Sequence, residues 1–355
     1  MAFQPSGPIA IQLPTRDFRI DAAKGVLILL VVVGHLLEVT NYWGAKSIRL
    51  PLTSIYMFHM PAFVFLAGAT AKTNRLGHRI GHLLILLLTF QALYLVDNAL
   101  TGETRTTSYF PFWTLWFLIA MIWWLMLLPL IRRYPRAAMA ISVLVSIGIG
   151  AVSGVGNDLG LSRTLVFMPF FTAGALFGNR ILSTATRAPV LIKGTILVAA
   201  MATVWLVFEA DLSPWLLFGN LSFGGLHVSL ARGLIVRTLL LLSAALMTFG
   251  LLSLMPRRPT RLAVVGGRSL AIYLLHGFVI MSVTALMPQF LQNLGSAAAV
   301  ASCLLIGMLI VSSLSLPVFE RLVRSYSETV VKIVFKLIRS LRLFAVRTQG
   351  SKSRS

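Results

Sequence analysis

Acidic residues and cysteine are scarce in this chain of 355 residues. It has 10 Asp and Glu residues against 31 Lys and Arg residues, which gives a net charge of +21. Its one cysteine, Cys303, excludes a disulfide within the chain and gives no basis for thiol-based metal or redox chemistry. Charged residues make up only 12% of the chain and hydrophobic residues 57%, which excludes an ordinary soluble domain.

Apolar runs of about 20 residues, each long enough to cross a bilayer, recur along nearly the whole chain. They predict an all-α polytopic membrane protein with about ten transmembrane helices and three parts: an N-terminal segment 1–19, a transmembrane domain 20–317 and a tail 318–355. The stretch 211–229 is short and interrupted by Gly and Pro, so it is either a re-entrant segment or an outer loop. The expected spans are 20–40, 52–71, 80–100, 111–131, 137–155, 163–181, 190–208, 228–253, 262–286 and 296–317.

Basic residues are concentrated in alternate connections between these runs. Because such connections face the cytoplasm, we expect a multi-pass protein of the cell inner membrane with both termini cytoplasmic. The cytoplasmic set is Lys72, Arg75, Arg79, Arg132, Arg133, Arg136, Arg180, Arg187, Lys193, Arg257, Arg258 and Arg261.

The tail beyond Glu320 is basic and amphipathic. Lys332, Lys336, Arg339 and Arg342 recur at steps of four, three and three, which places them on one face of a helix. We expect this helix to lie on the anionic lipids of the inner leaflet, in preference to forming a specific ligand site. The positive charge therefore does not indicate nucleic-acid binding.

The first span carries four ionisable residues on one side. Lys24 and His35 are eleven residues apart, which on a helix is three turns plus roughly 20° and a rise of about 16.5 Å. Asp21 and Glu38 fall about 40° and 60° to either side of that line. Charges facing lipid are costly, so this stripe should face the protein interior or a wet cavity.

Two further histidines, His59 and His276, lie at depths compatible with a chamber shared with His35 in the outer half of the membrane. Histidine suits the removal of a proton from a hydroxyl, because it titrates near neutral pH. A basic residue at the cytoplasmic mouth, such as Lys24, suits the phosphates of an anionic donor.

The same residues allow other interpretations. Asp21 and Lys24 could form a pair at the headgroup level, and His35 could be a hydrogen-bonded core residue. A proton-coupled transporter or exporter of a small glycan or metabolite would also use intramembrane His and Lys. A non-catalytic scaffold is disfavoured, because it would have no need for such costly charges.

Five segments together resemble the membrane acyltransferase 3 family, and within it the branch similar to fucose 4-O-acetylases. In chain order they are "RIDAAKGVLILLVVVGH", "IYMFHMPAFVFLAGA", "LWFLIAMIWW", "SRTLVFMPFFTAGALFG" and "SLAIYLLHGFVI". The resemblance covers most of the chain. It implies about ten core helices and transfer of an acyl group, usually acetyl, from cytoplasmic acyl-CoA to a hydroxyl of a cell-surface polysaccharide, oligosaccharide or lipid-linked sugar.

The resemblance also implies site residues. The family's basic residue and catalytic histidine of the first helix correspond to Lys24 and His35, although many members carry arginine at the first position, with a planar fork that lysine lacks. The family's arginine pair after the second helix is matched most nearly by Arg75 and Arg79, spaced one residue wider.

We therefore expect an O-acetyltransferase with His35 as general base, oriented by Glu38, and a donor site at Lys24, Asp21, Arg75 and Arg79. Acyl-CoA is a co-substrate, and no metal or permanently bound cofactor is expected. Direct transfer is favoured, since Cys303 has no visible base partner. The acceptor candidates are His59, His276, Tyr273, Arg163 and Trp116, of which Arg163 could instead be an interfacial anchor and Trp116, like Trp113, part of an aromatic belt.

Overall fold

The computed structural model describes residues 17–39, 42–101, 111–155, 158–286 and 295–352. Within these ranges the regular structure is entirely helical. The α-helices are α1 (Phe18–Val39), α2 (Lys46–Thr70), α3 (Leu76–Thr101), α4 (Trp116–Arg133), α5 (Pro135–Gly148), α6 (Leu161–Arg187), α7 (Val190–Glu209), α8 (Pro214–Phe218), α9 (Leu230–Ser253), α10 (Arg261–Gly267), α11 (Ser269–Leu286), α12 (Ser296–Leu314) and α13 (Pro317–Lys352). Short 3₁₀ turns are η1 (Tyr42–Gly44), η2 (Trp113–Leu115), η3 (Ile149–Ala151), η4 (Asp158–Gly160) and η5 (Gly224–Leu226).

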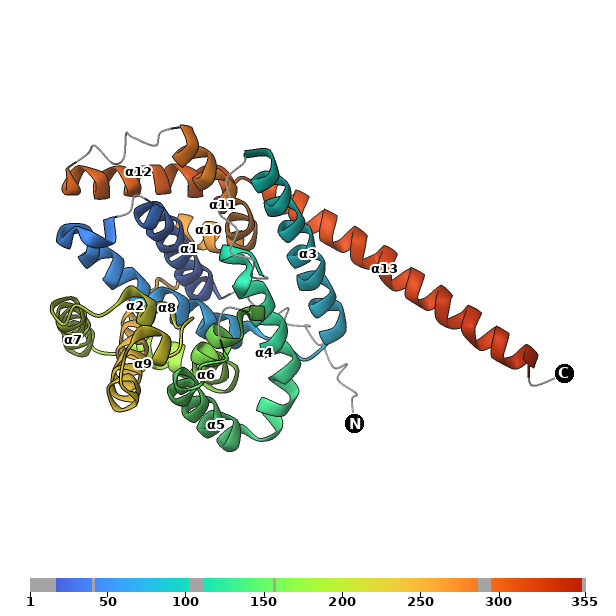
Figure 1. Ribbon diagram of the computed structural model, residues 1–355, viewed down its shortest axis with the longest axis horizontal. Coiled ribbons are helices and arrows are strands. Elements are labelled where there is room, and N and C mark those ends of the chain that lie inside the picture. The colour runs from blue at the N-terminus through green and yellow to red at the C-terminus, as the bar shows by residue number, and fades with distance from the viewer. Residues whose placement is uncertain (1–16, 40–41, 102–110, 156–157, 287–294, 353–355) are drawn as a thin grey trace, which may run out of the picture.

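Helices α1 and α2 form the centre of the bundle (Figure 1), where α1 packs against α2, α10, α11 and α12, and α2 packs against α6 and α9. Within the described residues, eight helices are long and apolar enough to cross a membrane, or nine when the bent pair α10 and α11 counts as one span. The chain is thus a multi-pass membrane protein built from helices. The predicted count of about ten spans stays a prediction.

Two expected spans differ from the structure. The apolar run 137–155 is a shorter helical segment, Pro135–Ala151. The run 262–286 is broken at Arg268, where α10 and α11 meet at 80°. The break follows Gly266 and Gly267, and glycines are costly in a helix interior because they have the most backbone freedom to lose. Arg268 is thereby held at a bend inside the bundle.

The ambiguous stretch 211–229 folds back onto one end of the bundle. Its short helix α8 buries Leu216 and Leu217, and the ring of Phe218 lies 4.9 Å from that of Tyr56 in α2. Arg49 holds the segment from α2 by an ion pair to Asp211 and a hydrogen bond of 3.0 Å to the carbonyl of Leu212. This segment therefore covers the end of the bundle where α1 finishes and α2 starts.

Glycines allow the central helices to touch backbone to backbone. A Cβ atom added to Gly25 in α1 would lie 2.1 Å from the carbonyl oxygen of Leu262 in α10. In the same way, Gly174 in α6 faces the carbonyl oxygen of Phe65 in α2 at 2.0 Å from such a Cβ. Small residues at helix crossings are typical of membrane bundles, where close packing holds the helices together.

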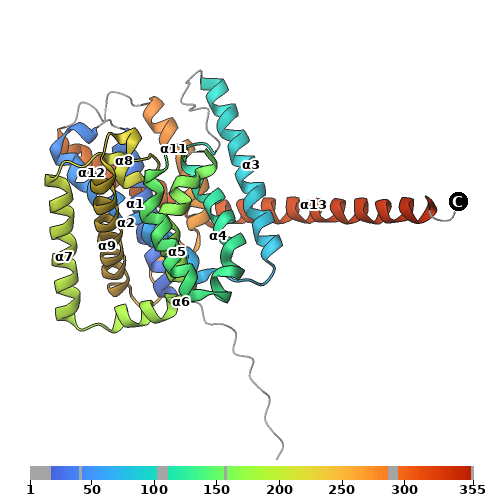
Figure 2. The ribbon, with the colours of Figure 1, turned by 60° about the horizontal axis from the view of Figure 1, so that its bottom comes forward.

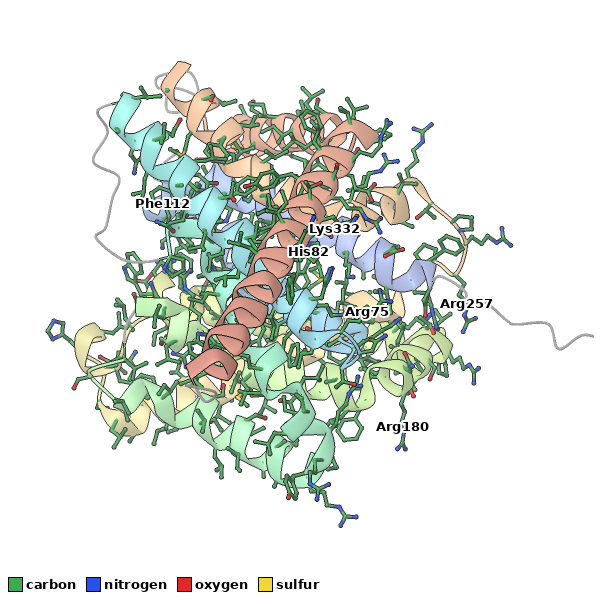
Figure 3. All side chains as sticks on the ribbon, turned by 90° about the vertical axis from the view of Figure 1, so that its right-hand side faces the viewer. Arg75, His82, Phe112, Arg180, Arg257 and Lys332 are labelled. Carbon is green, nitrogen blue, oxygen red and sulfur yellow. The ribbon has the colours of Figure 1, made fainter. Side chains whose placement is uncertain are left out.

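Hydrogen bonds join the connections predicted to be cytoplasmic at the other end of the bundle. Arg19 at the start of α1 donates to the hydroxyl of Thr186 at 3.1 Å, and Arg257 reaches the same oxygen at 3.5 Å. Arg132 donates to the carbonyl of Ala71 at 2.8 Å. In Figure 3, Arg75, Arg180 and Arg257 lie toward one end and Phe112 toward the opposite end. The basic connections thus share one end, as the positive-inside pattern requires.

The tail forms the long helix α13, which crosses α3 and projects away from the bundle, crosswise to α7 and α9 (Figure 2). Lys332 and Lys336 are exposed, as are the apolar side chains of Ile333 and Leu337. The side chains of Arg339 and Arg342, and the N-terminal segment before residue 17, lie outside the described residues. The division of the chain into three parts, with boundaries at residues 19 and 317, stays a prediction.

Candidate active site

Three polar side chains meet where α1 and α2 run side by side. His35 Nδ1 lies 3.1 Å from Glu38 Oε2, one helical turn further along α1. The hydroxyl of Tyr56, from α2, donates to the same carboxylate oxygen at 2.6 Å and lies 3.4 Å from His35 Nδ1. An ionised carboxylate only accepts hydrogen bonds, so Nδ1 of His35 carries the proton and Nε2 presents a lone pair. This arrangement gives His35 the tautomer of a base.

His276 of α11 stacks on His35, with ring centroids 5.5 Å apart and an angle of 23° between the planes. Its Nδ1 lies 2.6 Å from the carbonyl oxygen of Tyr273, an acceptor, so Nδ1 is the protonated nitrogen. Its Nε2 is buried without a hydrogen-bond partner among the described residues. His59 is buried next to Tyr56, at 4.9 Å between rings, and its Nδ1 lies 2.7 Å from the carbonyl oxygen of Ile55.

Aromatic residues and one arginine surround this cluster. The ring of Trp113 lies 4.8 Å from that of His35, edge to face. The guanidinium of Arg163, from the start of α6, lies 5.1 Å from the centre of the Trp116 ring and interacts electrostatically with Glu38. The hydroxyl of Tyr273 donates to the carbonyl of Thr114. The structure thus brings four of the five predicted acceptor residues, His276, Tyr273, Arg163 and Trp116, around His35. The fifth, His59, adjoins the cluster through its contact with the ring of Tyr56.

A cavity of about 530 Å³ runs from His35 to the basic end of the bundle. Lys24 and His35, the two ends of the predicted stripe, both line it. Its middle is apolar, with Met60, Phe63 and Leu86 among the side chains that contact it. With 1.5 Å of rise per residue, the eleven residues from Lys24 to His35 span about 16.5 Å. An extended group entering at Lys24 can therefore reach His35 without leaving the protein.

Two of the four predicted donor residues line this cavity. Lys24 and Arg79 line it, whereas Arg75 and Asp21 do not. Arg75 is exposed, with a positive φ of 52°, and its carbonyl accepts a hydrogen bond from the backbone N–H of Arg79 at 3.1 Å. Arg75 thus belongs to the turn that leads into α3.

Several residues of the histidine cluster and of the cavity cannot be identified from the sequence. Tyr56 is one of them, because spacing along α2 does not reveal its hydrogen-bond partner Glu38 in α1. Arg268 lies inside the expected span 262–286, where the preceding Gly266–Gly267 pair is a signal of the bend. His82 and the first turns of α13 also line the cavity. Among the described residues, no group of three His, Cys, Asp or Glu side chains is arranged to hold a metal ion.

The family model described as "Acyltransferase domain", of acyltransferase family 3, matches residues 17–316. Nodulation protein NolL of Mesorhizobium japonicum (strain LMG 29417 / CECT 9101 / MAFF 303099) is 30% identical over 185 residues, which cover 47% of this chain and 49% of that protein. Nodulation protein NolL of Sinorhizobium fredii (strain NBRC 101917 / NGR234) is 30% identical over 184 residues, covering 47% and 50%.

The chain thus spans about half the length of the curated relatives it matches. No solved structure matches significantly. The family match covers nearly all of the membrane bundle, from the residue before α1 to the residue before α13. This chain therefore belongs to the acyltransferase 3 family of membrane acyltransferases.

Proposed function

We propose that this protein is an O-acyltransferase that moves an acyl group, usually acetyl, from acyl-CoA to a hydroxyl of a cell-surface polysaccharide, oligosaccharide or lipid-linked sugar. The observation that carries the proposal is the cavity that joins basic residues at one end to a carboxylate-supported histidine at the other. A thioester donor and a hydroxyl acceptor that approach from opposite sides of a membrane require such a passage. The resemblance to fucose 4-O-acetylases favours a sugar acceptor.

In the proposed mechanism, His35 Nε2 takes the proton of the acceptor hydroxyl as its oxygen attacks the thioester carbonyl carbon. The carbon–sulfur bond then breaks, and the thiolate of CoA takes the proton from His35, so that ester and free thiol are the products. Glu38 keeps the proton of His35 on Nδ1 and stabilises the imidazolium that forms in between. The hydroxyl of Tyr56 fixes the carboxylate by its bond of 2.6 Å.

Donor and acceptor are assigned to the two ends of the cavity. Lys24 and Arg79, which line the basic end, would bind the donor phosphates. Asp21 and Arg75 would act there indirectly, Asp21 through α1 and Arg75 through the turn before Arg79. At the other end, Trp116 offers a flat face for a sugar ring, and Arg163 offers a cation for an acidic or hydroxyl-rich acceptor. His59, His276 and Tyr273 would shape this pocket.

The proposed orientation follows from the charge at the ends of the bundle. The end with Arg75, Arg180 and Arg257 faces the cytoplasm, and both termini lie on that side of the inner membrane. α13 would then lie on the anionic inner leaflet, with Lys332 and Lys336 near headgroups. We also propose that about ten spans cross the membrane, with Pro135–Ala151 and the bent α10–α11 pair included.

The test uses purified protein in phospholipid nanodiscs, acetyl-CoA labelled in the acetyl group, and a surface-glycan extract. We expect label in the glycan with the wild type and with Cys303→Ser, and none with His35→Ala. Transfer that survives in His35→Ala overturns the role of His35. Movement of glycan across vesicles without any acetyl transfer would instead support the proton-coupled transporter.

A further inference from the structure

The C-terminal helix α13 contributes one wall of the cavity, although the family match ends at residue 316, before it begins. The cavity-lining positions of α13 are spaced as one helical face, in the pattern i, i+3, i+4, i+7 and i+8. They are Glu320, Val323, Arg324, Ser327 and Glu328. The helix α13 thus has basic and apolar residues typical of a membrane-surface helix and, in addition, a face that lines the cavity.

α13 is anchored against α3 along this stretch. The hydroxyls of Thr89 and Tyr326 are 2.7 Å apart, and the ring of Phe335 packs against Gly81, where an added Cβ would lie 3.3 Å from it. Ser327 and Val331 are buried. Figure 3 shows α13 crossing the face of α3, with His82 beside it. The contacts fix which side of α13 faces the cavity.

Positive charge predominates at this end of the cavity. Four basic side chains line it, from α1, α3, the bend between α10 and α11, and α13: Lys24, Arg79, Arg268 and Arg324. The two acidic side chains of the lining each face an arginine, Glu320 at 3.5 Å from Arg268 and Glu328 at 3.1 Å from Arg324. The hydrogen bond from Arg324 holds the pKa of Glu328 below its usual value, so the carboxylate is ionised at neutral pH.

Arg324 is the accessible member of this set. Its side chain is 73% exposed and its hydrogen bond is to Glu328, whereas Arg268 is also bonded to the carbonyl of Ser315 inside the bend. An exposed guanidinium beside a carboxylate can turn to a phosphate while keeping part of its ion pair, because it has five N–H donors.

We propose that α13 completes the donor site and that Arg324 is a further residue that binds a phosphate of the acyl-CoA donor. The inference rests on the proposed function and deepens it. Arg324 would hold the charged part of the donor at the mouth, while Lys24 and Arg79 hold it further in and the thioester extends along the apolar middle toward His35. A helix outside the family-matched residues would thus set affinity for the donor.

The test compares Arg324→Ala, Arg324→Lys and Arg321→Ala in the full chain, in nanodiscs. Arg321 is the matched control, because it is exposed on the same helix, bonds only to the carbonyl of Pro317 among the described residues, and does not line the cavity. We expect Arg324→Ala to raise KM for acetyl-CoA about tenfold with kcat within twofold, Arg324→Lys to recover part of the loss, and Arg321→Ala to match wild type.

Binding of free CoA, measured by isothermal titration, separates the possible failures. If the wild type binds CoA and transfers acetyl, but Arg324→Ala has the same CoA affinity and KM as Arg321→Ala, the inference is overturned and the proposed function stands. Wild type that neither binds CoA nor transfers acetyl overturns both. The assay is repeated in neutral and in anionic lipid: an effect of Arg324→Ala confined to anionic lipid means that Arg324 binds lipid headgroups, which also overturns the inference.

Discussion

His35 and Glu38 form a histidine–carboxylate pair inside one helix, with Nδ1 and Oε2 3.1 Å apart. Their side chains are 16% and 26% exposed, so the pair is shielded from solvent but in reach of the cavity. Residues three apart lie on the same face of a helix, which is why α1 alone can build the pair. Tyr56 then ties it to α2 and fixes its direction.

Replacing Glu38 by glutamine tests the pair without changing its shape. The amide keeps the side chain's volume but removes the charge that stabilises the imidazolium of His35. We expect kcat to fall by about 10²-fold, with KM for acetyl-CoA unchanged because the proposed site for the donor phosphates is at the other end of the cavity. Steady-state kinetics with labelled acetyl-CoA measure both.

Glu209→Gln is the control for that substitution. Glu209 is an exposed carboxylate at the end of α7, away from the cavity lining. Its replacement should leave kcat and KM as in the wild type. Equal kcat values for wild type and Glu38→Gln would contradict the role of the pair.

The placement of Lys24 and His35 on one cavity could be predicted from the sequence because helical periodicity is local and regular. Contacts between helices could not be predicted in this way. The hydrogen bond from Tyr56 to Glu38 depends on how α2 is rotated against α1, and the spacing of residues in either helix does not contain that rotation. The sequence also predicts the bounds of long, strongly apolar runs: the expected span 20–40 differs from α1 (Phe18–Val39) by two residues at most.

Hydropathy alone reveals neither breaks within an apolar span nor the packing of one helix against another. The run 262–286 is predicted as one span, yet it is bent by 80° at Arg268, which donates to the carbonyl of Ser315 and forms an ion pair with Glu320. The amphipathic tail is predicted to be a membrane-surface helix. That Ser327 is buried follows only from the packing of α13 against the bundle, which includes α3. Both features depend on partners remote in sequence.

Lys24 provides a test of whether lysine replaces arginine at the donor end. Lys24→Ala should raise KM for acetyl-CoA by about tenfold, because a half-buried cation at the cavity wall is lost. Lys24→Arg keeps the charge and adds a planar fork, so its KM should stay within a few-fold of the wild type. Lys72→Ala, an exposed lysine outside the cavity lining, is the control. Similar KM values for all three variants would count against Lys24 as a donor ligand.

The crossing of α1 and α10 predicts a large difference between two glycine substitutions. Gly25→Ala would place a Cβ 2.1 Å from the carbonyl oxygen of Leu262, so the helices must separate at a cost of about 1–3 kcal/mol. Gly194→Ala in α7 meets nothing within 4 Å and should be neutral or stabilise the helix by up to about 1 kcal/mol. Thermal unfolding of the detergent-purified variants measures the difference. A Gly25→Ala protein as stable as Gly194→Ala would show that the two helices do not touch there.

The orientation of the bundle can be tested with the chain's single cysteine removed. Cys303 is the one cysteine of the sequence, so Cys303→Ser gives a background without thiols. Two exposed positions at opposite ends of α2, Ser47 and Thr73, are then changed to cysteine one at a time. Because the basic connection that contains Thr73 should face the cytoplasm, a membrane-impermeant maleimide added to intact spheroplasts should label Ser47→Cys and spare Thr73→Cys, and detergent should expose both. The opposite pattern would reverse the bundle in the membrane, placing Lys24 and Arg79 outside, where cytoplasmic acyl-CoA could not reach them.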